Sequence, residues 1–145
     1  ALADLLGQDG PYPFTSIELS EIVADAYLDR HAAGAVIEAK TGMTFSAAER
    51  TLLQKLAAAV ITRSARIVAA TFAGIIRHRA GETSLENQYI AIDGSVYEKV
   101  PLVAHHLRAA LNVLLADEAI NVQIILENGG SILGAALAAA MTERN

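Results

Sequence analysis

Apolar residues recur at helical spacing over the first half of the chain. A loop is predicted over residues 1–14, where glycine and proline are frequent, and a helix from there to about Leu28. Thr15 and Glu18 have the spacing of a capping box, in which each side chain bonds the other residue's backbone N–H at the start of a helix. A shorter helix is predicted over residues 35–40.

A much longer helix is predicted from a second capping box, at Ser46 and Glu49, to His78 or Arg79. Apolar and small side chains recur along it on one continuous stripe, which we expect to face the core. The stripe consists of Leu53, Leu56, Ala57, Val60, Ser64, Ile67, Val68 and Thr71. A helix of this length should cross the whole face of a small domain.

The pattern changes in the second half of the chain. After a polar loop over residues 81–87 come two short runs that are rich in β-branched and aromatic residues, 88–92 and 95–100. They flank the dipeptide Asp93-Gly94, and this arrangement predicts a β-hairpin. Gly94 is expected to adopt a positive φ in the turn, and without a Cβ it lets another group approach the backbone.

The remaining segments predict a helix, a strand and a helix. These are a helix over residues 101–115 with proline as its first residue, a buried strand over 121–126, a turn over 127–130 and a closing helix over 131–143. The turn Gly129-Gly130-Ser131 joins a strand to a helix, where backbone N–H groups and the helix dipole can meet an anion or a polar ligand. Most turns of this kind are simply tight connections.

Composition narrows the class of protein. A chain of 145 residues is one domain's worth, and 53% hydrophobic with only 19% charged residues indicates a compact, well-buried chain. The net charge of −5 argues against a nucleic-acid partner. The absence of cysteine fits a reducing compartment. The uncharged apolar run Ile67–Ile76 is much shorter than the ~20 residues of a membrane helix, and we expect a soluble, cytoplasmic chain without a membrane partner.

Three segments resemble the eukaryotic-type hexokinases. Ile90–Tyr97 resembles the family's adenosine motif, V-x-V-D-G-S-(V/L)-Y, and Arg63–Thr71 resembles the R-S-A-x-L-V-A-A-x segment that precedes it. Gly134–Leu137 matches the G-A-A-(L/M) of the last conserved turn. The matches fall in the family's order and at about its spacing, with weaker similarity back to Phe14. They cover most of this chain, which resembles only the carboxy-terminal part of a hexokinase.

The resemblance implies an α/β fold, part of a ribonuclease H-like (actin-like ATPase) lobe with long helices and a small mixed sheet. Residues 1–145 would be a single domain or fragment, the nucleotide-side part of a sugar kinase. The whole protein would use ATP with Mg²⁺ to phosphorylate the 6-hydroxyl of a hexose, and this part would form the adenosine wall. Its partners would be ATP, the amino-terminal remainder of the same protein and, through that remainder, the hexose.

The same resemblance assigns no catalytic residue to this chain. Phosphoryl transfer needs a cradle for the phosphates, bound Mg²⁺ and a base. In hexokinases the D-x-G-G-T phosphate loop, the catalytic aspartate and the sugar-binding Asn and Glu residues lie earlier in the chain. The 145-residue sequence contains none of these motifs. The fragment alone is therefore expected to be inactive. The spacing of its histidines predicts no metal site built from protein ligands.

The resemblance does imply nucleotide-binding positions. These are Asp93, Gly94, Ser95, Gly130, Ser131, Gly134, Ser16 and Ser20. Simpler interpretations stay open for some of them: Asp93 as a plain turn residue, and the two amino-terminal serines as capping or surface residues.

Two segments depart from the family's pattern. The family's G-S-G-x-G-A-A corresponds here to residues 130–136, with Ile132 in place of the middle glycine. Residues 14–20 resemble F-x-T-x-x-x-S, with Ser16 in place of the threonine. Because of Ile132, an alternative function is a catalytically inactive hexokinase-like sugar sensor or regulatory scaffold.

Overall fold

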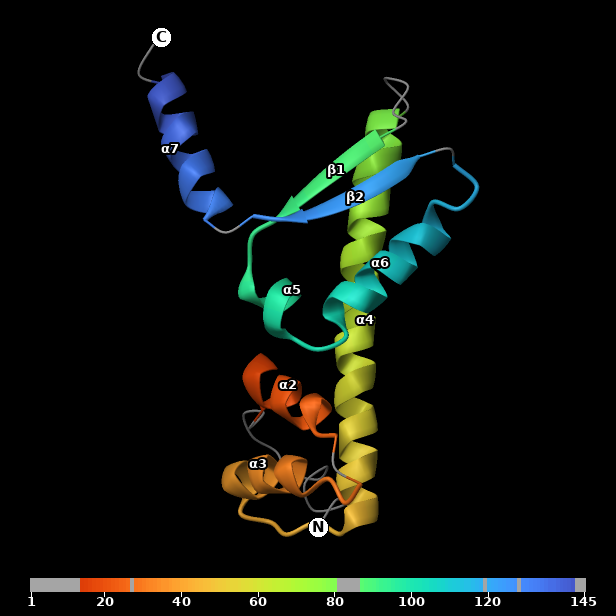
Figure 1. Cartoon of the computed structure of the whole chain (residues 1–145), viewed down its shortest axis with the longest axis vertical. Helices are drawn as coiled ribbons and strands as arrows, with labels where there is room; N and C mark the ends of the chain where they lie inside the picture. The colour runs from red at the N-terminus through yellow and green to blue at the C-terminus, as the bar shows by residue number, and fades with distance from the viewer. Residues whose placement is uncertain (1–13, 27, 81–86, 119, 128, 143–145) are drawn as a thin grey trace. The chain divides into compact units, whose positions relative to one another are not determined.

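The computed structural model of the chain describes residues 14–26, 28–80, 87–118, 120–127 and 129–142, and Figure 1 shows their helices and strands. In chain order the elements are α2 (Ser16–Ala24), α3 (His31–Thr41), α4 (Ala47–Ala80), β1 (Asn87–Ile92), α5 (Ser95–Lys99), α6 (Val103–Leu114), β2 (Asn121–Leu126) and α7 (Gly130–Thr142). The chain is thus mixed α/β and mostly helical. It divides into two compact units, an amino-terminal unit (1–65 and 100–106) and a carboxy-terminal unit (66–99 and 107–145). Loops were predicted over residues 1–14 and 81–87; residues 1–13 and 81–86 lie outside the described residues, and Asn87 is the first residue of β1.

Helix α2 begins with the predicted capping box. The Thr15 backbone N–H donates to Glu18 Oε2 (2.8 Å), and the Ile17 N–H donates to Thr15 Oγ1 (3.2 Å). Lys40 Nζ of α3 lies 2.5 Å from the other Glu18 carboxylate oxygen. The bond from Lys40, followed by those from Thr15, lowers the pKa of Glu18 from 4.5 to about 2. The helix ends at Ala24, short of the predicted Leu28.

The core of the amino-terminal unit lies among α2, α3 and the first turns of α4. Its buried side chains are Ile22, Ala33, Ile37, Phe45 and Ala57. Polar bonds support the same packing, because the Asp25 carboxylate accepts from the Ala33 N–H (2.7 Å). From α4, Gln54 Nε2 donates to the carbonyl oxygens of Ile22 (3.0 Å) and Asp25 (2.7 Å) at the end of α2. The carboxyl end of α2 is therefore tied to both neighbouring helices.

Helix α4 has the predicted limits but buries a different face. Its capping box is present, with the Ser46 N–H donating to Glu49 Oε2 (2.9 Å) and the Glu49 N–H donating to Ser46 Oγ (3.3 Å). The buried positions are Ala57, Ile61, Ala65, Ala69, Ala73 and Ile76. Most of the predicted stripe is exposed, since Leu56, Val60, Ile67 and Val68 are 41–54% exposed. The prediction was wrong because α4 is apolar on both faces, and the face rich in small alanines is the one that packs closely.

Among the described residues, one helix is long and apolar enough to cross a membrane. It is the stretch 47–79 of α4, with a mean hydropathy of 1.5 over 18 residues. This criterion considers only the length and composition of a helix, and the core helix of a soluble protein also meets it. The expectation of no membrane partner stays a prediction.

The predicted hairpin does not form. Residues 88–92 belong to β1 as expected, but 95–99 form the short helix α5 rather than a second strand. The partner of β1 is β2, and the two strands run parallel in register from Asn87↔Asn121 to Ile92↔Leu126. Figure 1 shows this two-stranded sheet. Because parallel strands require a crossover, the segment after β1 must leave the sheet, and α5 and α6 supply that crossover. The described sheet is parallel, not mixed.

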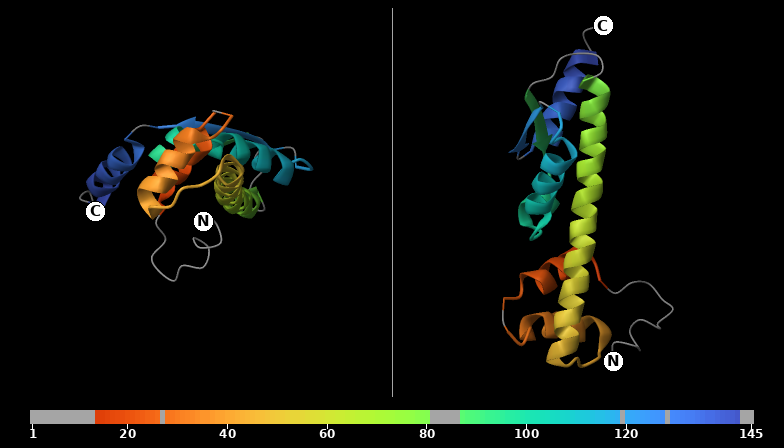
Figure 2. Two further views of the ribbon diagram at one scale, coloured as in Figure 1. Left: turned by 90° about the horizontal axis from the view of Figure 1, so that it is seen from below. Right: turned by 90° about the vertical axis from the view of Figure 1, so that its right-hand side faces the viewer.

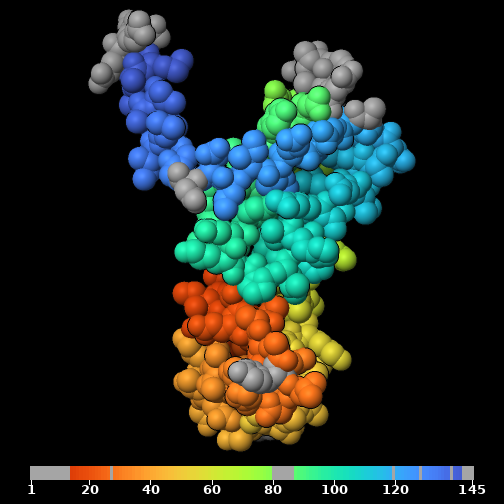
Figure 3. Space-filling model, in the orientation of Figure 1, coloured from red at the N-terminus to blue at the C-terminus, as the bar shows by residue number. Residues whose placement is uncertain are grey.

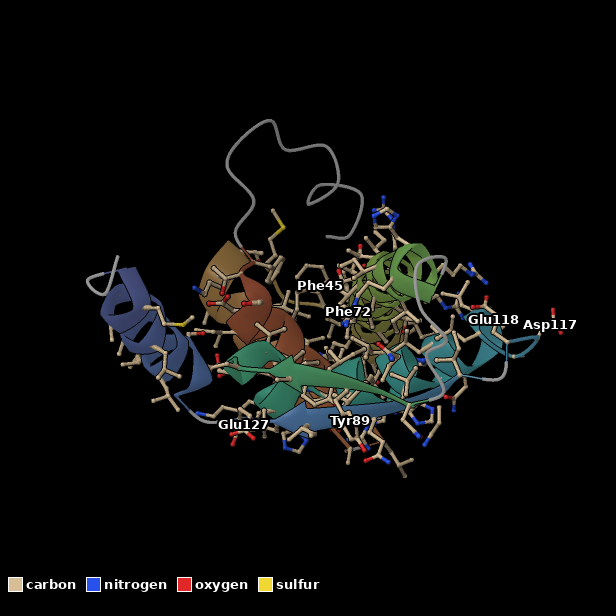
Figure 4. The ribbon with its side chains drawn as sticks, turned by 90° about the horizontal axis from the view of Figure 1, so that it is seen from above. Phe45, Phe72, Tyr89, Asp117, Glu118 and Glu127 are labelled. Carbon is tan, nitrogen blue, oxygen red and sulfur yellow. The ribbon has the colours of Figure 1, made fainter. Side chains whose placement is uncertain are left out.

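Helix α6 covers one face of the sheet in the carboxy-terminal unit. It begins at Val103, two residues after Pro101, so the predicted helical start at the proline was wrong. Along β1 the side chains alternate, with Gln88 buried and Tyr89, labelled in Figure 4, 64% exposed. Strand β2 has the predicted limits but is exposed along much of its length, not buried. One face of the sheet therefore packs on helix and the other is open in the described chain.

The Arg77 side chain of α4 forms hydrogen bonds at the carboxyl end of α6. Arg77 donates to the Leu114 carbonyl (2.5 Å) and to Glu118 Oε1 (2.6 Å). Figure 2 shows α6 beside this part of α4 from two further directions. Helix α7 differs, because its large side chains Ile132, Leu133, Leu137 and Met141 are 57–78% exposed, and in Figure 3 it stands away from the sheet.

Candidate functional site

The parallel pairing brings two turns to one edge of the sheet. Ile92 and Leu126, the last residues of β1 and β2, are register partners, and the Glu127 N–H extends the ladder by donating to the Ile92 carbonyl (2.9 Å). The segment 93–95 and the described residues 127 and 129–131 therefore lie side by side, at the carboxyl ends of both strands. This edge is where open α/β sheets bind their ligands.

A direct hydrogen bond joins the two turns. Asp93 Oδ2 accepts from the backbone N–H of Ser131 at 2.8 Å, across 38 residues of sequence. The Ser131 N–H, the Ser131 hydroxyl and the Gly129 N–H all hold the pKa of Asp93 below its ordinary value of 3.8, in that order of importance. The carboxylate is thus ionised and occupied by protein donors. Asp93 thus satisfies backbone N–H groups, as the plain-turn interpretation expects, but these groups follow β2 and do not belong to a hairpin.

Glycine suits its three positions at this edge for different geometric reasons. Gly129 has φ +79°, a left-handed conformation that favours glycine. A Cβ at Gly130 would lie 3.3 Å from the Cβ of Glu127, which is a tight contact. Figure 4 labels Glu127. Gly94 has the predicted positive φ, but at +159° it is close to extended backbone rather than to a hairpin turn. Apart from Gly94 itself and its two chain neighbours, no atom of the described residues lies within 4 Å of a Cβ built at Gly94, so its exposed face has room for a ligand.

The structure brings together five of the eight predicted positions. Asp93, Gly94, Ser95, Gly130 and Ser131 share the strand-end edge. Gly134 lies one turn further along α7 and is exposed, as is Ile132 before it. Ser16 and Ser20 lie on α2 in the amino-terminal unit, so their convergence on this edge stays a prediction.

A neighbouring pair was not anticipated from the sequence. Arg108 of α6 donates from Nε to the Tyr97 hydroxyl of α5 at 3.0 Å, and Tyr97 is buried. Arg108 also lines a cavity of about 160 Å³ between α6 and β2, with Leu111, Asn112, Val122 and Ile124. The pair fixes α5, which follows Ser95 directly. No local pattern predicts it, because the prediction placed Tyr97 on a strand.

These features define an α/β protein with a glycine-rich edge at the carboxyl ends of parallel strands. The profile of the family described as Hexokinase matches residues 5–141, and the chain belongs to the hexokinase family. It is 30% identical over 137 residues to hexokinase-2 of Candida albicans, covering 92% of this chain and 28% of that protein. It is 39% identical over 94 residues to hexokinase-7 of Oryza sativa subsp. japonica, covering 63% of this chain and 20% of that protein.

Family membership confirms the resemblance carried by the three sequence segments. The chain spans about a fifth of the length of rice hexokinase-7 and of hexokinase-2 from Arabidopsis thaliana. The family implies an actin-like ATPase fold. The described chain does not itself show that fold, since it contains one parallel strand pair with its helices.

Proposed function

We propose that this chain is the nucleotide-side part of a hexose kinase and that its strand-end edge forms the adenosine wall. The observation that carries the proposal is the Asp93–Ser131 hydrogen bond, which holds the two glycine-rich turns at one edge. Family membership supports the reaction class, since ATP with Mg²⁺ supplies the transferred phosphoryl group in such a kinase.

The residues at this edge suit the uncharged end of a nucleotide. Gly94 offers open backbone beside the exposed Ser95, and neither position places a positive charge there. One first-turn N–H of α7, that of Ser131, is already bonded to the negatively charged Asp93, which disfavours a phosphate there. Phosphate, Mg²⁺ and the hexose would be held by the remainder of the protein. The cysteine-free composition is consistent with a cytoplasmic location.

A catalytically inactive sugar sensor or scaffold is the second candidate. Ile132 is 78% exposed in the first turn of α7, where the family pattern has glycine, and so puts an apolar side chain beside the proposed wall. Coupled measurement of ATP-dependent hexose phosphorylation by the protein that carries this chain separates the two functions. Turnover supports the kinase, whereas hexose binding without turnover supports the sensor.

Substitution of Gly94 tests the wall itself. Gly94→Val fills the open space beside the backbone, so the KM for ATP should rise while hexose affinity stays unchanged. Gly74→Val is a matched control, because a Cβ there also meets no atom within 4 Å but the residue lies inside α4. A folded Gly94→Val protein with a normal KM for ATP would disprove the adenosine wall.

The 145-residue chain by itself should show no glucose-dependent ATP turnover, because it contains neither the phosphate loop nor the base. The assay compares the purified chain with the protein that carries it. Turnover by the chain alone would contradict the proposal that the phosphate loop and the base lie outside these 145 residues.

A further inference from the structure

The cavity between α6 and β2 has a mainly apolar lining with two polar side chains. Leu111 of α6 is 2% exposed, and Val122 and Ile124 of β2 are half-buried. Arg108 and Asn112, one helical turn apart on α6 and both exposed, complete the lining. A concave, mostly apolar site with a few convergent polar groups is the usual form of a small-molecule site.

This cavity is separate from the strand-end edge. Val122 and Ile124 precede Leu126, the last residue of β2, by four and two residues. At 3.3 Å per residue, they lie about 7–13 Å back along the strand. The described residues that line the cavity include none of the edge, so a ligand bound here would not occupy the position proposed for adenosine.

The guanidinium of Arg108 is held in place and has donors to spare. Its Nε donates to the Tyr97 hydroxyl at 3.0 Å, and its Cζ lies 6.0 Å from the centre of the Tyr97 ring. Within the described part of the chain, its two terminal nitrogens form no hydrogen bond and no carboxylate pairs with it. These nitrogens present the planar donor pair that matches a carboxylate. Because Tyr97 already restrains the side chain, less conformational freedom is lost when a ligand binds.

The size and the lining of the cavity limit the ligand. Its volume is about 160 Å³, and an engineered apolar cavity of about 150 Å³ in another protein binds benzene. A doubly charged phosphate fits poorly, because one guanidinium and one amide cannot replace its hydration and the remaining side chains are apolar.

We propose that this cavity is a binding site for a small monocarboxylate whose apolar body is about the size of a benzene ring. The carboxylate pairs with Arg108 and accepts from the Asn112 amide, and the apolar body packs on Leu111, Val122 and Ile124. The site gives the protein a ligand that is distinct in class from a nucleotide and from a sugar.

Benzoate is the probe, and calorimetric titration of the protein that carries this chain measures its affinity. Benzamide has the same shape without the charge and should bind about tenfold more weakly, the scale of one hydrogen bond between charged groups. Arg108→Met keeps an unbranched apolar side chain and should weaken benzoate binding by about the same factor. Tyr97→Phe leaves the guanidinium in place and should weaken binding less than Arg108→Met does. Arg66→Met is the matched control, an exposed arginine of α4 outside this cavity.

Methyl NMR of the wild-type protein tests the location without any variant. Benzoate should shift the methyl signals of Val122 and Ile124, and saturating ATP should leave its affinity unchanged. The proposal fails if the wild-type protein binds no benzoate, if ATP displaces it, or if these methyl signals do not move. Equal affinity for benzoate and benzamide, or wild-type affinity in a folded Arg108→Met protein, would contradict the role of the charge. Melting temperatures identify a variant that does not fold. None of these measurements requires turnover, so they are independent of the proposed function.

Discussion

Truncation of Phe45 should strongly destabilise the amino-terminal unit. Phe45 is 1% exposed and packs in the cluster that includes Ile22 and Ile37. Replacing a fully buried phenylalanine by alanine costs about 3–5 kcal/mol, because transfer free energy and cavity cost add. At about 2–4 °C per kcal/mol, this corresponds to a fall in melting temperature of roughly 6–20 °C. The loss is a large fraction of the ~5–15 kcal/mol that stabilises a typical domain.

Urea unfolding and amide hydrogen exchange of the Phe45→Ala protein measure this loss. Exchange should accelerate in α2 and α3, which surround Phe45, and much less in β1 and β2 of the other unit. Leu28→Ala is the control, because Leu28 is 98% exposed and its truncation should cost less than ~0.5 kcal/mol. If Phe45→Ala costs no more than this control, the packing described around α3 is wrong.

Three further predictions concern single polar groups. Gln54→Leu removes the side-chain donor from the carbonyl oxygens of Ile22 and Asp25 at the end of α2 and should cost about 1–3 kcal/mol in urea unfolding; full stability would show that water replaces the amide. The pKa of Glu18 is depressed to about 2 chiefly by Lys40, so its stabilising effect is complete above about pH 4.5 and is lost as the pH falls toward 2. Stability measured across that range should fall, and Glu18→Gln should flatten the fall; an unchanged slope would contradict the ion pair. Arg77→Met should destabilise by ~1 kcal/mol through loss of the bond to the end of α6, whereas Arg63→Met on the exposed face should have no measurable effect.

The sequence predicted local structure well because local bonds determine it. Both capping boxes lie within four residues, and the helix starts they predict, at Ser16 and Ala47, are observed. The limits of β2 were also correct, since a short β-branched run bounded by turn residues leaves few alternatives.

Long-range pairing could not be predicted in the same way. Val96 and Tyr97 favour strands by type, yet α5 forms because β1 pairs with a strand beyond it. The five clustered site positions were selected by resemblance, whereas the bond that unites them spans 38 residues and has no local signature. The buried face of α4 escaped prediction because periodicity cannot choose between two apolar faces.

The parallel pairing of β1 with β2 has a consequence for synthesis on the ribosome. Register partners such as Asn87 and Asn121 are 34 residues apart, and β1 emerges first. At about 5–20 residues per second, β1 waits roughly 2–7 s before its partner strand has been made. During that interval the edge of β1 that pairs with β2 is uncovered, so the nascent chain passes through a stage at which a chaperone can bind this edge.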